Sequence, residues 1–125
     1  MGNSAEYNTS WDEGNEELWD KKYQVWEKRD WEEYLEENLT FPFTATRFED
    51  MDSNPFADTK DAPFSVGHSV EVLGIDDEDE MRGIIVKVKE GRKKGYLLLC
   101  ELEVISRDDK NFWPVREYVV WFANQ

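Results

Sequence analysis

The sequence predicts an α+β fold: a small SH3-like β-barrel with an N-terminal helical arm and a short C-terminal helix. Two observations carry this prediction. Apolar residues recur at helical spacing in residues 12–38 and 114–122, whereas apolar and polar residues alternate from Gly67 onward. The alternating region contains short β-branched segments joined by turn residues, a pattern that favours a small curved barrel.

The first helical region carries an aromatic stripe. At about 100° per residue, its members lie within about 80° of one another; they are Trp19, Tyr23, Trp26 and Tyr34. Asp30 followed by Glu33 has the spacing of a capping box, so a second helix is expected to begin at Trp31. Pro42 ends the helical region, because the residue before a proline resists helical geometry. The stripe either packs against the domain or is exposed to grip a partner.

The strands are expected after Gly67. Residues 83–89, rich in isoleucine and valine, form the clearest strand, and a shorter alternating stretch over 69–73 precedes it. The turn at Gly91 leads into two further strands over 96–100 and 102–105. Pro114 then occupies a position that the first turn of a helix tolerates. Tyr118 and Phe122 continue this pattern at helical spacing, which predicts the C-terminal helix.

The net charge of the chain limits the classes of partner that it can bind. Its 125 residues include 15 basic and 29 acidic side chains, for a net charge of −14. Residues 1–40 hold 12 acids and 4 bases, a balance of 4 − 12 = −8. This excess argues against direct binding of nucleic acid and favours divalent cations, a basic protein partner or mimicry of a nucleic acid. No membrane span is expected, because no run of about 20 apolar residues occurs. Docking of the first helical region on a membrane is disfavoured, because an interfacial helix normally carries Lys and Arg on its polar face.

The chemistry of the remaining residues predicts a non-enzymatic protein. Cys100 is the single cysteine and permits no internal disulfide, which fits a reducing compartment. The N-terminus lacks a secretory signal, so a cytoplasmic location is expected. Cys100 and His68 are expected to be structural. No phosphate-binding loop, metalloprotease helix or zinc-ligand spacing is present.

The strongest candidate metal site lies in residues 50–61. Oxygen-bearing side chains fall there at positions 1, 3, 5, 9 and 12 of a twelve-residue loop: Asp50, Asp52, Asn54, Asp58 and Asp61. That is the ligand rhythm of an EF-hand calcium loop. Pro55 stands where such a loop has glycine, Asp61 stands where it has glutamate, and prolines replace the flanking helices. The alternative is a polar surface turn, since Asp and Asn favour turns for backbone reasons.

A second acidic cluster lies between two predicted strands. It consists of Asp76, Asp77, Glu78, Asp79 and Glu80. Adjacent carboxylates repel one another unless a cation lies among them, so a hairpin loop here would either hold calcium or be a solvated turn. Glu101 and Glu103 are two residues apart on a predicted strand and are therefore expected on one face, as added oxygen ligands or facing solvent.

Several short motifs occur in a fixed order from Trp31 to the C-terminus. Trp31, Tyr34 and Leu35 precede Phe41-Pro42-Phe43 and Pro63-Phe64; Gly83-Ile84-Ile85-Val86, Leu99-Cys100-Glu101 and Trp121-Phe122-Ala123-Asn124 follow. In combination they resemble the bacterial calcium-binding family typified by cyanobacterial CcbP. The resemblance implies a compact α+β domain at residues 31–125 that binds Ca²⁺ through acidic surface residues without catalysis. Residues 1–30 lie outside it and are expected to form an acidic, aromatic helical arm.

These observations together predict a cytoplasmic calcium buffer or sensor that is not an enzyme. Its affinity for calcium is expected to be modest, because Pro55 and the short Asp61 weaken the best loop. One alternative is an acidic interaction protein or nucleic-acid mimic that binds a basic surface of a partner. Another is a purely structural SH3-like adaptor that binds no ion.

Overall fold

The computed structural model describes residues 8–48 and 63–125. The chain divides into two compact units, Met1–Asp30 and Trp31–Gln125. The metal-site candidates Asp50, Asp52, Asn54, Asp58 and Asp61 lie outside the described residues. Within the described part of the chain, no helix is both long and apolar enough to cross a membrane.

The first unit contains a short 3-10 helix, η2 (Ser10–Glu13), and helix α1 (Glu16–Glu27). Asn15 caps α1, because its side chain accepts a hydrogen bond from the Leu18 amide at 3.1 Å. The aromatic side chains of this unit contact one another: Trp11 meets Trp26 edge-on at 5.2 Å between ring centroids, and Trp19 stacks on Tyr23 at 5.1 Å. Part of the predicted aromatic stripe is therefore used in packing within the arm itself.

The described part of the second unit, residues 31–48 and 63–125, contains two α-helices and five strands. In chain order these are α2 (Trp31–Asn38), β1 (Phe43–Arg47), β2 (Ser69–Asp79), β3 (Gly83–Glu90), β4 (Lys93–Leu98), the 3-10 helix η3 (Leu99–Glu101), β5 (Leu102–Glu103) and α3 (Phe112–Ala123). The predicted helix start at Trp31 and the predicted C-terminal helix are both present. The latter begins at Phe112, slightly before the expected proline, and runs for 12 residues.

The strands form one antiparallel sheet in the order β4-β3-β2-β1-β5. Burial alternates along β2, where Val70 and Val72 face the core and Ser69 and Glu71 face outward. The pairing of β2 with β3 shifts register between Val72 and Gly74 and again between Ile75 and Asp77. Such irregularities bend a strand and increase its twist. The α+β class is thus confirmed, but the described strands form an open sheet, so the SH3-like barrel stays a prediction.

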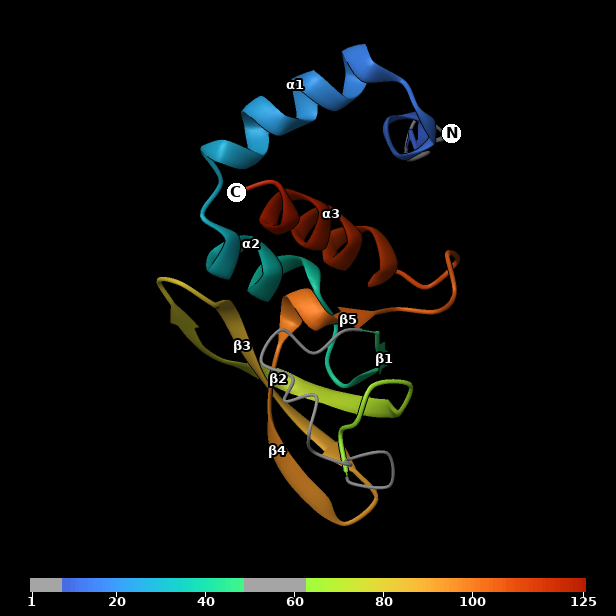
Figure 1. The fold of residues 1–125 in the computed structure, drawn as a ribbon, viewed down its shortest axis with the longest axis vertical. Coiled ribbons are helices and arrows are strands. Elements are labelled where there is room, and N and C mark those ends of the chain that lie inside the picture. Colours follow the sequence, from blue (N-terminus) through green and yellow to red (C-terminus); the bar gives the residue numbers. More distant parts are fainter. Residues whose placement is uncertain (1–7, 49–62) are drawn as a thin grey trace, which may run out of the picture. The chain divides into compact units, whose positions relative to one another are not determined.

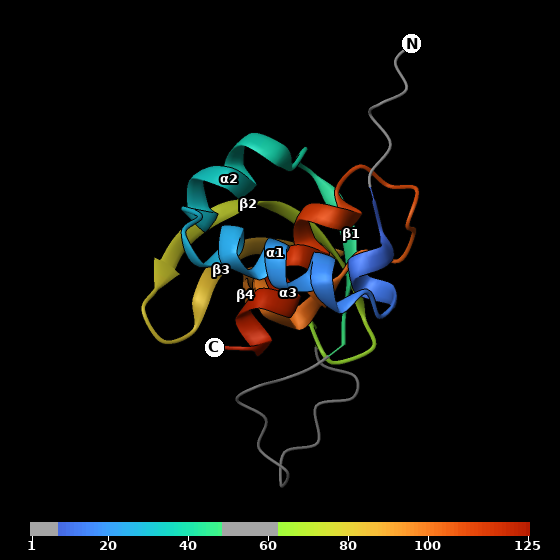
Figure 2. The same ribbon diagram turned by 90° about the horizontal axis from the view of Figure 1, so that it is seen from above.

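Helices α2 and α3 lie on the same side of the sheet (Figure 1, Figure 2). Trp31 of α2 packs on two aromatic rings of α3, Tyr118 and Trp121, with centroids 5.4 Å away in both cases. The Tyr118 hydroxyl oxygen accepts a hydrogen bond from the Ile84 amide of β3 at 2.8 Å. Tyr118 is 1% exposed, and its burial raises the pKa of the phenol well above the ordinary value. This contact joins the helical layer to the sheet.

Candidate metal centre

The chain leaves the sheet at Phe48 and re-enters the described structure at Pro63, and the residues on either side of this interval are bonded to one another. Arg47 Nη1 donates a hydrogen bond to the Phe64 carbonyl at 2.8 Å, and the Gly67 amide donates to the Arg47 carbonyl at 2.7 Å. The Phe48 amide donates to the Glu101 carbonyl at 2.9 Å. The two flanks of the segment that holds the predicted calcium loop are therefore held at one place.

Two networks of charged side chains hold these flanks together, and the bonded flanks are called here the base of the segment. Arg47 Nη2 lies 2.9 Å from Glu101 Oε1, and Glu101 is only 2% exposed. Glu90 accepts a hydrogen bond from the Phe64 amide at 2.7 Å with one carboxylate oxygen, and its other oxygen lies 2.9 Å from His68 Nδ1. Both main-chain polar groups of Phe64 are thus bound by charged side chains.

Phe64 needs this support because its backbone is in a left-handed conformation, with φ of 67°. That region is costly for a bulky side chain without a glycine's freedom. Two hydrogen bonds hold Phe64 in this conformation: its carbonyl accepts one from Arg47, and its amide donates one to Glu90. Strain of this kind persists only where surrounding contacts over-determine it, and it is common at functional sites.

The expectation for Glu101 and Glu103 was wrong in its geometry. Glu101 ends η3 and is buried against Arg47, whereas Glu103 lies on β5 and is exposed. The chain turns through a 3-10 helix between the strands, so the alternation that would place both carboxylates on one face does not apply. Glu101 is occupied by an internal ion pair.

The second acidic cluster also differs from its predicted hairpin loop. Asp76 to Asp79 continue β2, and only Glu80 lies in the turn, which spans residues 80–82. Main-chain pairing with β3 extends to the end of the cluster, through Asp77 opposite Ile85 and Asp79 opposite Gly83. The side chains stay exposed, so water screens their repulsion and the strand continues.

Asp79 organises the turn that follows. Its Oδ1 accepts hydrogen bonds from the amides of Arg82 at 2.9 Å and Met81 at 2.8 Å. These bonds, that from Arg82 first, lower the pKa of the Asp79 carboxyl. The carboxylate therefore acts as a charged cap of the β2–β3 turn.

The acidic end of β2 does not form a calcium cage alone. Calcium takes six to eight oxygen ligands at short range, whereas successive side chains of a strand point to opposite faces. Among the residues that the structure describes, no three Asp, Glu, His or Cys side chains gather in a way that would hold a metal ion. The arrangement of the cluster is better suited to contributing negative charge, or one or two ligands, than to forming a complete calcium site.

The two residues that sequence reasoning expected to be structural have structural places. His68 is bound to Glu90, and Cys100 is a buried thiol of η3 with 5% exposure. The networks around Arg47 and Glu90 were missed in the sequence, because their partners are separated by 54 residues in the first case and 22 in the second. The spacing of residues within a short stretch of sequence cannot predict contacts between residues so far apart.

Comparison with known proteins identifies the family of the chain. Residues 18–122 match the CcbP calcium-binding family, which is described as "Calcium binding". The match begins within α1, earlier than the Trp31 boundary of the resemblance seen in the sequence. The crystal structure of Anabaena CcbP is similar with a TM-score of 0.53 and 25% sequence identity, over 74% of this chain and 71% of that one.

No curated protein is significantly similar to the chain in sequence. The family match nevertheless spans most of the residues, and the fold of a member is shared. Calcium is the ion that both comparisons support. The chain belongs to the CcbP family of calcium-binding proteins.

Proposed function

We propose that this chain is a non-catalytic cytoplasmic calcium buffer or sensor whose main ligands lie in residues 50–61. Family membership carries the proposal, since the family is one of calcium binding. The ligand spacing of Asp50, Asp52, Asn54, Asp58 and Asp61 supports the choice of segment. The second acidic cluster contributes long-range attraction for the cation and one or two outer ligands.

The fixed base of the segment supports this assignment. Arg47 and Phe64 are bonded directly on either side of the interval. A chain segment with its ends already together loses less conformational entropy when its oxygens gather round an ion. The affinity is nevertheless expected to be modest, in the micromolar range or weaker, because Pro55 and Asp61 depart from a tight calcium loop.

An SH3-like arrangement is part of the proposal. The strand order, with η3 inserted between β4 and β5, supports it. The register shifts in β2 allow that strand to bend and to serve both halves of the sheet. Residues 50–61 lie between β1 and β2 in the chain order, and binding residues are commonly found in segments that connect the strands of a scaffold.

Calorimetry tests the proposed site. Asp50→Asn with Asp52→Asn should weaken calcium binding at least about tenfold, because two charged ligands are lost. Glu36→Gln with Glu37→Gln is the matched control: both residues are exposed on α2, and the same charge is removed. The control should change the affinity by less than about twofold at physiological salt, where screening weakens distant charges.

Two results would contradict the proposal. Equal losses in both double variants would mean diffuse attraction by the surface rather than a site in the segment. No measurable calcium binding, together with binding to basic proteins that collapses as salt rises, would instead favour the acidic interaction protein. With a real site, a hundredfold excess of calcium over its Kd stabilises the fold by about 2.7 kcal/mol.

A further inference from the structure

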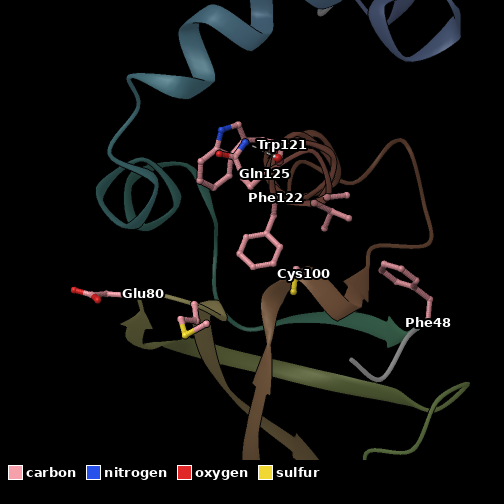
Figure 3. A pocket seen from close by; sticks show the side chains of 9 residues that line it. Phe48, Glu80, Cys100, Trp121, Phe122 and Gln125 are labelled. Atoms are coloured by element: carbon pink, nitrogen blue, oxygen red, sulfur yellow. Dashed lines mark hydrogen bonds between the residues drawn. The ribbon is translucent and has the colours of Figure 1, made fainter. Parts of the chain in front are cut away.

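A groove runs along one side of the second unit, between the C-terminal half of α3 and the strands. Its volume is about 540 Å³. Four regions of the chain line it: Phe48 just after β1, the β2–β3 turn, η3, and the last turns of α3 with the C-terminal Gln125. Figure 3 shows the Phe122 ring pointing from α3 toward η3, where Cys100 lies. Glu80 and Phe48 lie on opposite sides of this ring.

The lining is mainly apolar and partly open to solvent. Met81 is 87% exposed and Phe48 39% exposed, and Val119, Trp121 and Phe122 are half-buried. A single exposed apolar side chain is ordinary on a protein surface. A contiguous apolar surface around a concavity is different, because such patches mark interaction sites. Methionine also adapts its shape to varied apolar partners.

The charged side chain in the lining of the groove is acidic, whereas Arg82 of the same turn lines a separate pocket together with Asp79. Glu80 is the charged residue among the described residues that line it, and its carboxylate points away from the other labelled side chains at the rim (Figure 3). Glu78 and Asp79 lie immediately before it on β2, and the Asp79 carboxylate is the charged cap of the adjoining turn. An apolar floor with acid at one rim complements a segment that has apolar anchors and basic side chains.

We propose that this groove is the docking surface for a basic amphipathic segment of a partner protein. Apolar side chains of that segment would seat on Met81 and Phe122, and a Lys or Arg would pair with Glu80. A second copy of the chain is the poorer occupant, because two chains of net charge −14 repel each other. The inference does not depend on the calcium site.

A helical peptide composed of Leu and Lys, with Leu at positions i, i+3, i+4 and i+7, is a suitable probe. Calorimetry and amide NMR of the full chain at physiological salt should show binding, with shifts concentrated at residues 80–82 and 119–123. A peptide with the same Leu positions but Glu in place of Lys should bind at least about tenfold more weakly, through repulsion from the rim.

The decisive variant is Met81→Asp. This variant removes an apolar contact and adds a negative charge. Docking in the groove and attraction by charge alone therefore predict opposite changes in the affinity for the Leu/Lys peptide. Docking in the groove predicts an affinity at least about tenfold lower, since the variant lacks the methionine side chain that the docked segment would bury. Attraction by charge alone predicts a higher affinity.

Ile105→Asp is the matched control, because Ile105 is 65% exposed, is not among the residues that line the groove, and acquires the same charge. It should leave the affinity unchanged or slightly raised. Glu80→Gln should weaken binding by about threefold and reduce its salt dependence. Unchanged or tighter binding by Met81→Asp overturns the proposal, as do shifts centred elsewhere. Sedimentation showing self-association through the groove that Met81→Asp abolishes would overturn it as well.

Discussion

Removing Arg47 should destabilise the second unit more than any exposed charge would. Its guanidinium lies 2.9 Å from Glu101, with the two side chains 14% and 2% exposed. Arg47→Met would leave the Glu101 carboxylate buried without its cation, and breaking a buried pair in this way costs about 3–5 kcal/mol. For a unit of this size, about 3 kcal/mol corresponds to a decrease in Tm on the order of 12 °C.

The double variant Arg47→Met with Glu101→Leu separates the effect of the ion pair from the effect of the other contacts of Arg47. Both buried charges are then absent, so most of the desolvation penalty disappears, and at least about 2 kcal/mol should be recovered relative to the sum of the single variants. Urea unfolding followed by circular dichroism measures each free energy of unfolding. Lys21→Met is the exposed control, since the Lys21–Glu17 pair has side chains 72% and 83% exposed. It should cost less than about 0.5 kcal/mol.

Additive single-variant effects, within about 0.5 kcal/mol, would refute this reasoning. They would mean that the ion pair contributes no coupling and that Arg47 acts through its hydrogen bond to Phe64 alone. A cost for Arg47→Met as small as that of the exposed control would show that water reaches Glu101.

Three further predictions follow from the packing of α3 on β3 and from the division of the chain. Tyr118→Phe should cost about 1–3 kcal/mol in urea unfolding, because the buried Ile84 amide loses its acceptor. Since the pKa of Tyr118 is raised in the folded state, its stabilising contribution is complete below the unfolded value near 10 and is lost as pH rises toward the folded one. Stability should therefore fall above about pH 10 with a smaller slope in the variant; equal slopes would contradict this. Gly83→Ala should destabilise the protein more than Gly91→Ala by chemical denaturation: both glycines have positive φ, but a Cβ at Gly83 would meet Tyr118 and Phe122, whereas one at Gly91 meets open space. A chain beginning at Trp31 should unfold cooperatively and still bind calcium in calorimetry, because the second unit is compact by itself; aggregation of this chain would show that the arm is part of its core.

Local patterns in the sequence were sufficient for the elements that depend on neighbouring residues. The helix start at Trp31, the β-branched strand over residues 83–89 and the C-terminal helix were predicted because capping residues and apolar periodicity act within a few positions. The oxygen-ligand spacing of residues 50–61 is local in the same sense and stays a prediction. The acidic cluster was expected in a hairpin loop, and this was wrong for four of its five residues, because pairing with β3 carries the strand as far as Asp79.

The sequence by itself determined the acidic charge, the candidate ligand sets, which contain oxygen only, and the resemblance to a calcium-binding family. Among the residues that the structure describes, tertiary contacts alone decided which carboxylates are engaged in internal bonds. Glu101 and Glu90 have ordinary positions in the sequence, yet folding places them beside Arg47 and His68, where they hold the base of the segment. The groove likewise combines Phe48, which follows β1, with residues from the β2–β3 turn, η3 and α3. Such sites depend on contacts between distant parts of the chain, and the three-dimensional packing of the sheet and helices creates them.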